Sequence, residues 1–361
     1  MELCLSPDLG GLELYMQRCC SQLGPEVVAV VAQTGKLYPR LLDSGVETHT
    51  LKRRSRPLPL FAAKRLALLL DALEIDLLHI HWTNDIPLAA LAKRFSSRPI
   101  RLISTRQMQI TRPKKDLYHD FLYRQIDLHL AITAALARTM RQMLNPLLAE
   151  RVKTLYYGVP SPENWLTSDE RLQLRQELGL DSSTFVVSLV GRIKRYKGQH
   201  LLVEAIGRAI DAGEDVAAVM VGHAIEAEYL AQLRQEVVSR GWQQRILFQD
   251  FCDNPQGLMQ ACDCVVLTTV EETFGLVLIE AMRAGVAVVG SDRGGVPEII
   301  EHEESGLLFC SGDSDDLYQQ LQRLWRDPQW RQELARAGRV RGDRLFAEDL
   351  HFQELRNLLQ Q

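Results

Sequence analysis

Short apolar segments alternate with amphipathic segments along most of the chain, and this alternation occurs in two successive rounds. In the first round, the apolar segments predict strands at residues 2–6, 27–32, 46–50, 76–81, 100–104, 127–132 and 151–156. In the second round, they predict strands at residues 184–191, 215–222, 245–249, 264–269, 286–290 and 306–309. Helical periodicity fills the gaps, as at residues 60–73 and 133–144. This alternation predicts an α/β chain of two Rossmann-like domains, each a doubly wound parallel sheet covered by helices on both faces.

A cluster of glycine and proline at residues 157–162 separates the two rounds of alternation. Such clusters end strands and are typical of interdomain linkers. We therefore expect an N-terminal domain at residues 1–158, a C-terminal domain at residues 159–343 and a helix at residues 344–361. Ligands of open α/β sheets bind at the carboxyl ends of the strands. Two such domains facing each other would enclose one central cleft.

The composition is that of a soluble globular protein, with 46% hydrophobic and 24% charged residues among 361. No apolar run in the sequence reaches the roughly 18–20 residues that a membrane span needs. Residues 1–7 are typical of a short buried strand and lack the basic segment and longer apolar core of a signal peptide. The seven cysteines, an odd number without zinc-site spacing, indicate reduced thiols. These features predict a cytoplasmic protein.

The net charge of −4 conceals an asymmetry between the two halves. Residues 1–158 carry 22 Lys and Arg against 14 Asp and Glu, whereas the remainder carries 20 against 32. The basic residues gather at 52–56, at 64–65 and at 106–115. They are either ordinary solvated side chains, or they face anionic lipid or an anionic acceptor. Nucleic acid is not expected as a partner, because these stretches lack interleaved aromatic residues and match no nucleic-acid module.

Two carboxylates, Glu272 and Glu280, bracket a Phe-Gly-Leu turn with seven residues between them. Glu272 follows a predicted strand, and Glu280 falls about one turn into the predicted helix that comes next. Residues 274–276 form the entrance of that helix, where backbone N–H groups and the positive end of the dipole favour an anionic or hydroxyl-rich ligand. The two carboxylates there could hold the hydroxyl groups of a sugar nucleotide.

A basic loop, Gly-Arg-Ile-Lys-Arg-Tyr-Lys-Gly at residues 191–198, follows the predicted strand 184–191 and opens the next predicted helix. Such a loop could bind a diphosphate, because a diphosphate ligand needs fixed positive charge around it. Arg192 can offer a planar fork and Lys197 a point charge, both close to a helix N-terminus.

Three further segments follow predicted strands of the first round. Gly10 and Gly11 allow a close backbone approach to a ligand where a helix begins. His79 and His81 share one face of a strand, and His81 is the candidate for ligand contact because it is nearer the carboxyl end. Arg106, at the end of the next strand, could contact an acceptor or a phosphate.

One segment could be mistaken for a metal site. Asp313-Ser314-Asp315 spells the Asp-x-Asp pair that can hold a divalent cation. It directly precedes the helical pattern at residues 317–325, where acidic residues are favoured caps. We interpret it as a helix cap, and no metal site is expected in the chain.

Together these segments resemble the motifs of GT-B glycosyltransferases, most closely those of the large retaining family 4. Residues 272–280 resemble the E-x7-E signature, and residues 191–198 resemble the G-R-x-x-x-x-K-G motif. Residues 10–11 match the family's glycine-rich loop, and residues 294–298 its G-G-x-P-E segment. The resemblance implies the GT-B fold, in which residues 344–361 would cross back to the first domain.

The resemblance also implies a nucleoside-diphosphate sugar donor, with its diphosphate on Arg192 and Lys197. It places the donor sugar near Glu272 and His81, and the ribose on Glu280. The implied donor-binding residues are Gly10, Gly11, Arg192, Lys197, Glu272, Phe274, Gly275, Leu276 and Glu280. The expected catalytic residues are Glu272, Arg192, Lys197 and His81. Neither a metal nor another cofactor is required.

The function implied by the resemblance is retaining transfer of a hexose-type sugar to a cell-envelope glycan acceptor. That acceptor would be lipopolysaccharide, a lipid-linked glycan or an exopolysaccharide. The basic first half would then bind the acceptor, with Arg106 as one contact, and could face the anionic inner surface of the cytoplasmic membrane. Two alternatives stay open, a GT-B sugar-nucleotide 2-epimerase and a degenerate nucleotide-binding partner subunit.

Overall fold

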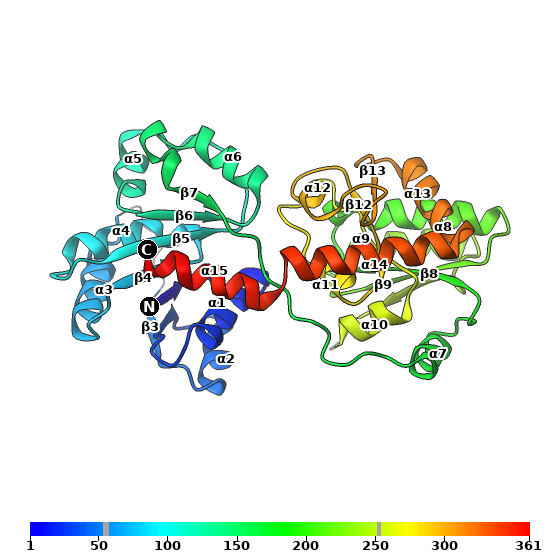
Figure 1. Ribbon diagram of the computed structural model, residues 1–361, viewed down its shortest axis with the longest axis horizontal. Coiled ribbons are helices and arrows are strands. Elements are labelled where there is room, and N and C mark those ends of the chain that lie inside the picture. Colours follow the sequence, from blue (N-terminus) through cyan, green and yellow to red (C-terminus); the bar gives the residue numbers. More distant parts are fainter. Residues whose placement is uncertain (53–57, 251–253) are drawn as a thin grey trace. The chain divides into compact units, whose positions relative to one another are not determined.

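The computed structural model describes residues 1–52, 58–250 and 254–361, which form two compact units (Figure 1). The first unit comprises Met1–Tyr156 together with Leu350–Gln361, and the second comprises Tyr157–Asp349. Of the basic stretch at residues 52–56, all but Lys52 lies outside the described residues. Helices flank the sheet of each unit on both sides, which confirms the predicted doubly wound α/β fold.

Within the described chain, the first unit has a seven-stranded parallel sheet in the order β3-β2-β1-β4-β5-β6-β7. The strands are β1 (Glu2–Cys4), β2 (Ala29–Ala32), β3 (Thr48–Leu51), β4 (Leu77–Ile80), β5 (Arg101–Arg106), β6 (Leu128–Ala131) and β7 (Val152–Thr154). The helices are α1 (Gly11–Gln22), α2 (Leu37–Asp43), α3 (Leu60–Ala72), α4 (Ile86–Phe95), α5 (Leu117–Tyr123) and α6 (Ala134–Met143). Strand β2 is buried at every position, because a parallel sheet covered on both faces favours a continuous apolar run.

The second unit has, in its described residues, a six-stranded parallel sheet in the order β10-β9-β8-β11-β12-β13. The strands are β8 (Phe185–Val190), β9 (Val216–Val221), β10 (Ile246–Gln249), β11 (Cys264–Leu267), β12 (Ala287–Ser291) and β13 (Leu307–Phe309). The helices are α7 (Ser168–Glu177), α8 (Gln199–Asp211), α9 (Ala227–Ser239), α10 (Pro255–Ala261), α11 (Leu276–Arg283), α12 (Val296–Ile299), α13 (Ser314–Arg326) and α14 (Pro328–Leu345). Each predicted strand of both rounds has a counterpart in the two sheets.

The strand order reverses at one place in each sheet. In the first sheet the reversal falls between β1 and β4, and in the second between β8 and β11. In open α/β sheets the crossover connections leave two such strands in opposite directions, and ligands bind beyond the carboxyl ends of these strands. The loops after β1, β4, β8 and β11 are therefore the places where functional side chains are expected.

The last helix, α15 (Glu348–Gln360), contributes its residues from Leu350 onward to the first unit. At its C-terminal end, Arg101 donates to the carbonyl oxygens of Leu359 (2.6 Å) and Leu358 (3.0 Å). This is where the helix dipole favours a cation. Among the described residues, no helix has both the length and the apolar character that crossing a membrane requires.

A histidine near the start of α15 links three parts of the first unit. His351 Nδ1 lies 2.6 Å from the carbonyl oxygen of Tyr156, and its Nε2 lies 2.9 Å from the hydroxyl of Tyr15. Because a carbonyl oxygen can only accept, Nδ1 carries the proton and Nε2 accepts from Tyr15. Burial lowers the pKa of His351 to about 4, so the imidazole is neutral near pH 7.

Candidate functional site

Two loops at the reversal point of the second sheet hold opposite charges against each other. Lys197 ends a short 3-10 turn, Arg195–Lys197, after β8, and Glu272 lies in the loop after β11. Lys197 Nζ is 2.6 Å from Glu272 Oε2, and the two side chains are 18% and 19% exposed. Burial alone would lower the pKa of Lys197, but the Glu272 carboxylate and the Tyr196 hydroxyl outweigh it and raise this pKa. The lysine is therefore a fixed positive charge.

The backbone of the Lys197 loop is locked against the strand beside it. Thr268 donates its hydroxyl to the carbonyl oxygen of Lys197 at 2.8 Å. Gly198, the N-cap of α8, has a φ of +73°, and a Cβ there would lie 2.3 Å from the carbonyl oxygen of Thr268. Only glycine fits this approach. The close contact fixes where α8 begins and where the lysine emerges.

A third loop, after β12, contacts the backbone of Glu272 and holds it in place. Gly295 donates its N–H to the carbonyl oxygen of Glu272 at 2.8 Å. Gly294 has a φ of +65°, and a Cβ on it would lie 2.0 Å from the same oxygen. Ser291 adds a hydroxyl bond of 2.8 Å to the carbonyl oxygen of Thr269. The two glycines of the G-G-x-P-E segment thus allow its backbone to approach and hold the loop that carries Glu272.

Helix α11 starts directly after this loop. Gly275 is its N-cap with a φ of +111°, and Leu276 is its first residue. Phe274 is 3% exposed and meets the rings of Tyr157 and Phe346 edge to face, with centroids 5.8 and 5.9 Å apart. The buried ring anchors the helix entrance, whose first N–H groups have no partner within the helix.

The other two predicted donor residues of this unit lie on the same elements. Arg192 is exposed in the loop after β8, and its carbonyl oxygen accepts from the Gln199 side chain at 3.0 Å. Within the described residues, the guanidinium of Arg192 pairs with no carboxylate. Glu280 is half-buried in the second turn of α11. The geometry brings Lys197 and Glu272 into contact and leaves Arg192 facing solvent.

In the first unit, Gly10 and Gly11 lie where α1 begins. Gly10 is the N-cap, and its N–H donates to the Glu13 carboxylate at 2.8 Å. Its φ of −155° is extended backbone that any residue can adopt. The acidic residue two positions after Gly11 therefore has a local role, which is to close the first turn of the helix.

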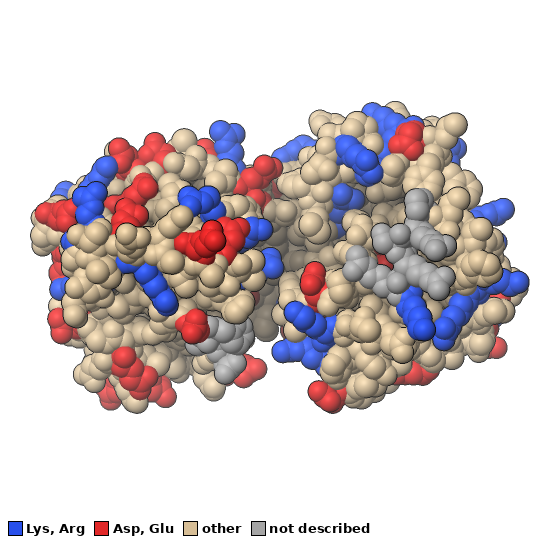
Figure 2. All heavy atoms as spheres, turned by 180° about the vertical axis from the view of Figure 1, so that it is seen from behind, with Lys and Arg blue, Asp and Glu red and all other residues tan. Residues whose placement is uncertain are grey.

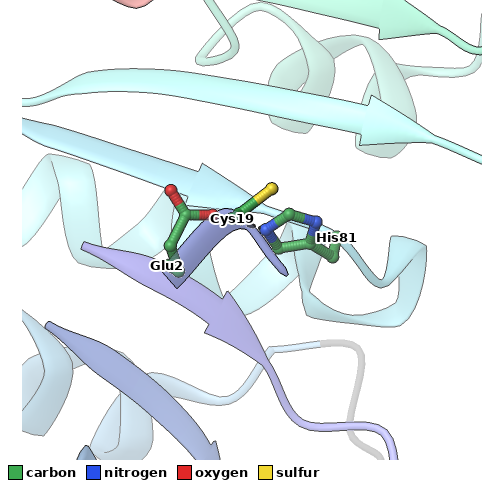
Figure 3. Close-up of side chains that lie close together, drawn as sticks. All are labelled: Glu2, Cys19 and His81. Atoms are coloured by element: carbon green, nitrogen blue, oxygen red, sulfur yellow. Dashed lines mark hydrogen bonds and ion pairs between the residues drawn. The ribbon is translucent and has the colours of Figure 1, made fainter. Parts of the chain in front are cut away.

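His81 follows β4 and belongs to a buried cluster with Glu2 and Cys19 (Figure 3). Its Nε2 is 2.5 Å from Glu2 Oε2, and the ring is 1% exposed. Burial lowers the pKa of His81 to about 4. His79 Nδ1 lies 2.9 Å from the same carboxylate oxygen. Burial alone would raise the pKa of Glu2, but the two histidines outweigh it and lower this pKa.

The Glu2, Cys19 and His81 atoms all lie within 4.8 Å of one another, which is the spacing of a metal site. Two features of the group favour a hydrogen-bonded cluster over a metal site. Burial raises the pKa of the Cys19 thiol well above its usual value, and a thiol must lose its proton to bind a metal. Glu2 is already bonded to His81. Sequence reasoning missed Glu2, whose only signal is a carboxylate inside an apolar strand.

Arg106, at the end of β5, is 7% exposed. Its Nε donates to the carbonyl oxygen of Met108 (2.9 Å) and its Nη2 to that of Gln109 (3.0 Å). The residue lines a cavity of about 420 Å³ in the first unit. Aromatic residues of that cavity, Trp82 and Tyr123, were not anticipated from the sequence, because they come from separate turns that only the fold brings together.

Comparison with known proteins gives the family. A family model described as "Glycosyl transferases group 1" matches residues 170–341, and one described as "Glycosyl transferase 4-like" matches residues 2–139. The first match spans the loops that carry Lys197, Glu272 and Gly294. The chain belongs to the group 1 glycosyl transferases. The resemblance inferred from the sequence motifs is thereby confirmed.

Two relatives and one solved structure show how much of this transferase is similar to other proteins. It is 26% identical over 335 residues to N-acetyl-alpha-D-glucosaminyl L-malate synthase of Bacillus anthracis, covering 89% of this chain and 86% of that protein. It is 28% identical over 199 residues to the lipopolysaccharide core biosynthesis mannosyltransferase LpsB of Rhizobium meliloti, 54% of each chain. The HepE structure from Anabaena, in complex with UDP and glucose, matches at a TM-score of 0.84 with 24% identity. That match covers 99% of this chain and 98% of HepE, and it shows the same fold.

Proposed function

We propose that this transferase moves a hexose-type sugar from a nucleoside-diphosphate sugar to a cell-envelope glycan acceptor with retention at the anomeric carbon. The Lys197–Glu272 ion pair at the reversal point of the second sheet carries the proposal. It holds a fixed positive charge and a carboxylate together in a loop framework that only glycines allow. Among similar proteins, HepE has been solved with UDP and glucose, which supports a nucleotide-sugar donor.

The proposed roles follow from charge and position. Transfer leaves a diphosphate with growing negative charge, and Lys197, Arg192 and the N-terminus of α11 would stabilise it. Glu272 would hold donor hydroxyls, and Glu280 the ribose. With cationic side chains in this role, the proposed reaction needs no metal ion. Gly10, Gly11 and His81 remain proposed donor contacts from the first unit.

The acceptor side of the proposal rests on the first unit. Residues 1–158 carry a marked excess of Lys and Arg, and Figure 2 shows such side chains gathered over one region of the first unit on this face. LpsB, one of the similar proteins, acts in lipopolysaccharide core biosynthesis. We place the protein in the cytoplasm, peripherally at the inner face of the membrane. Sedimentation with anionic-lipid vesicles at low salt tests this placement, and a protein that stays in the supernatant contradicts it.

The donor and the stereochemistry can be tested with the purified full chain. It is incubated with UDP-, GDP- and ADP-hexoses in EDTA, and release of nucleoside diphosphate is followed with and without lipopolysaccharide-core acceptors. We expect one donor to turn over in an acceptor-dependent way, and the product to keep the donor's anomeric configuration by NMR. An inverted product, or an epimerised donor without acceptor, would refute the proposal.

A further inference from the structure

The cavity in the first unit lies at the carboxyl edge of its sheet. Arg106 comes from the end of β5, Trp82 directly follows β4, and Tyr123 belongs to α5. Among the described residues, four cations line it, namely Lys52, Arg106, Arg112 and Lys114, against one carboxylate, Asp85. The formal excess is therefore three positive charges. All these residues belong to the first unit, whereas the Lys197–Glu272 ion pair belongs to the second.

These cations have little compensation inside the protein. Arg106 is 7% exposed, and its guanidinium donates hydrogen bonds to two backbone carbonyl oxygens. In the described part of the chain, neither Arg106 nor Lys114 forms an ion pair with a carboxylate. Asp85 Oδ2 accepts the backbone N–H of Leu5 at 2.8 Å. Burying an uncompensated charge is costly, so the cavity favours an anion.

The cations also oppose one another. Lys114 Nζ lies 3.4 Å from His119 Nε2, and His119 Nδ1 donates to Asp116 at 2.6 Å. Burial, then Arg112 and Arg106, lower the pKa of Lys114. Like charges that line one cavity repel one another until a counter-charge enters. A phosphate monoester, with about −1.5 to −2 charges near pH 7, compensates three cations better than a single carboxylate.

The walls of the cavity fit a sugar as well as an anion. Trp82, Tyr118 and Tyr123 are aromatic, and Asn84 supplies an amide. Sites for small ligands typically measure about 300–1,000 Å³ and combine apolar walls with a few placed polar groups. We propose that this cavity binds a phosphate monoester carried by the acceptor. The assignment rests on the proposed transferase function, since it names the class of acceptor.

The test is a calorimetric titration of the full chain with glucose 6-phosphate, glucuronate and glucose. We expect glucose 6-phosphate to bind at least about tenfold more tightly than the other two. Vesicles with and without phosphatidic acid form a second arm, which distinguishes a lipid-borne phosphate monoester from one on a soluble sugar. Equal affinity for all three sugars, with no preference for phosphatidic acid, overturns the assignment.

Variants locate the binding. Lys114→Gln and Arg112→Gln should each weaken phosphate binding by about tenfold or more, since each removes a charge-assisted contact. Arg94→Gln is the matched control, because Arg94 is an exposed cation in the last turn of α4 and does not line the cavity. Arg106→Gln is less suitable, because its guanidinium also holds the loop of Met108 and Gln109.

A donor-site phosphate gives a different pattern. Binding lost in Lys197→Ala but kept in Lys114→Gln and Arg112→Gln would place the phosphate in the second unit and overturn the assignment. Donor binding is titrated on the same preparations. If the donor binds and glucose 6-phosphate does not, only this inference fails. If no donor binds, the proposed function fails whatever the cavity holds.

Discussion

Lys197 Nζ and Glu272 Oε2 lie 2.6 Å apart, across the point where the strand order of the second sheet reverses. The two charges compensate each other while both side chains are about four-fifths buried. A donor diphosphate would compete with Glu272 for the ammonium group. The carboxylate would then be released to accept hydrogen bonds from sugar hydroxyls. One contact would thus couple diphosphate binding to sugar binding.

Lys197→Met, Glu272→Gln and the double variant should distinguish the contribution of this ion pair to catalysis from its contribution to stability. Each should lower kcat/KM for transfer by about 10²–10³-fold, as removal of one preorganised charge-stabilising group does. Each should also destabilise the chain by about 1–3 kcal/mol, because a buried partner is left unsatisfied. The double variant should recover part of the stability and none of the activity. Steady-state kinetics and urea unfolding measure the two effects.

The matched control is an exposed ion pair in the same unit. Arg323 Nη2 lies 2.6 Å from Glu303 Oε1, with side chains 40% and 52% exposed. Arg323→Met should cost less than about 1 kcal/mol and leave transfer unchanged. Full activity in both Lys197→Met and Glu272→Gln would remove the ion pair from the mechanism.

Gly294→Ala should damage the site through the backbone. A Cβ at Gly294 would lie 2.0 Å from the carbonyl oxygen of Glu272 and must displace that loop. Gly213→Ala is the control, because Gly213 also has a positive φ (+81°) but its Cβ would meet nothing within 4 Å. Both variants should carry a strain of about 1–2 kcal/mol. Only Gly294→Ala should also weaken donor binding, which calorimetry would show, and equal donor affinity in the two variants would contradict the supporting role.

The strands of both sheets could be predicted from the sequence because each is a short apolar run bounded by turn residues. The positions of Lys197 and Glu272 followed from the same pattern, since loops after strands gather at one edge of a parallel sheet. The Asp-x-Asp segment was also interpreted correctly. The Asp313 side chain accepts from the N–H groups of Asp315 and Asp316 at the start of α13.

Contacts between residues far apart in the chain could not be predicted in this way. Glu2 meets His81 across 79 positions, and Tyr15 meets His351 across 336. Neither pair has a local spacing that marks it, because the contact exists only once the strands are in register and α15 is docked. The cavity around Arg106 is of the same kind, since its residues come from separate loops.

One helix, α14, was absent from the sequence prediction.

Asp313→Ala should affect helix stability and not the reaction. Loss of the cap removes two hydrogen bonds and should cost about 0.5–2 kcal/mol. Because no metal is expected to take part, transfer by the wild type should be unchanged in EDTA, and transfer by Asp313→Ala should match it at low temperature. Activity that disappears in EDTA and returns with Mg²⁺ or Mn²⁺ would contradict this. Asp315→Ala removes the other carboxylate of the motif but keeps the cap, and so serves as the control.

His351 should make the first unit sensitive to acid. Its pKa is lowered from 6.5 to about 4 in the folded state, so the unfolded chain takes up a proton that the folded chain resists. Stability from this group is therefore complete above about pH 6.5 and is lost as the pH falls towards 4. The loss is at most about 1.4 kcal/mol per pH unit. Burial lowers the pKa of His81 to about 4 and that of His129 to about 3, so they act in the same direction.

His351→Gln tests this contribution, because glutamine stays neutral and can still bond Tyr15 and the Tyr156 carbonyl. Between pH 7 and pH 5, the wild type should lose up to about 2 kcal/mol more stability than the variant. Hydrogen exchange, read peptide by peptide, assigns the loss to the first unit. His49→Gln makes the same substitution at a partly exposed histidine of the same unit, and so controls for the exchange of side chain itself. Identical slopes in wild type and His351→Gln would mean that the α15 contact does not titrate in this range.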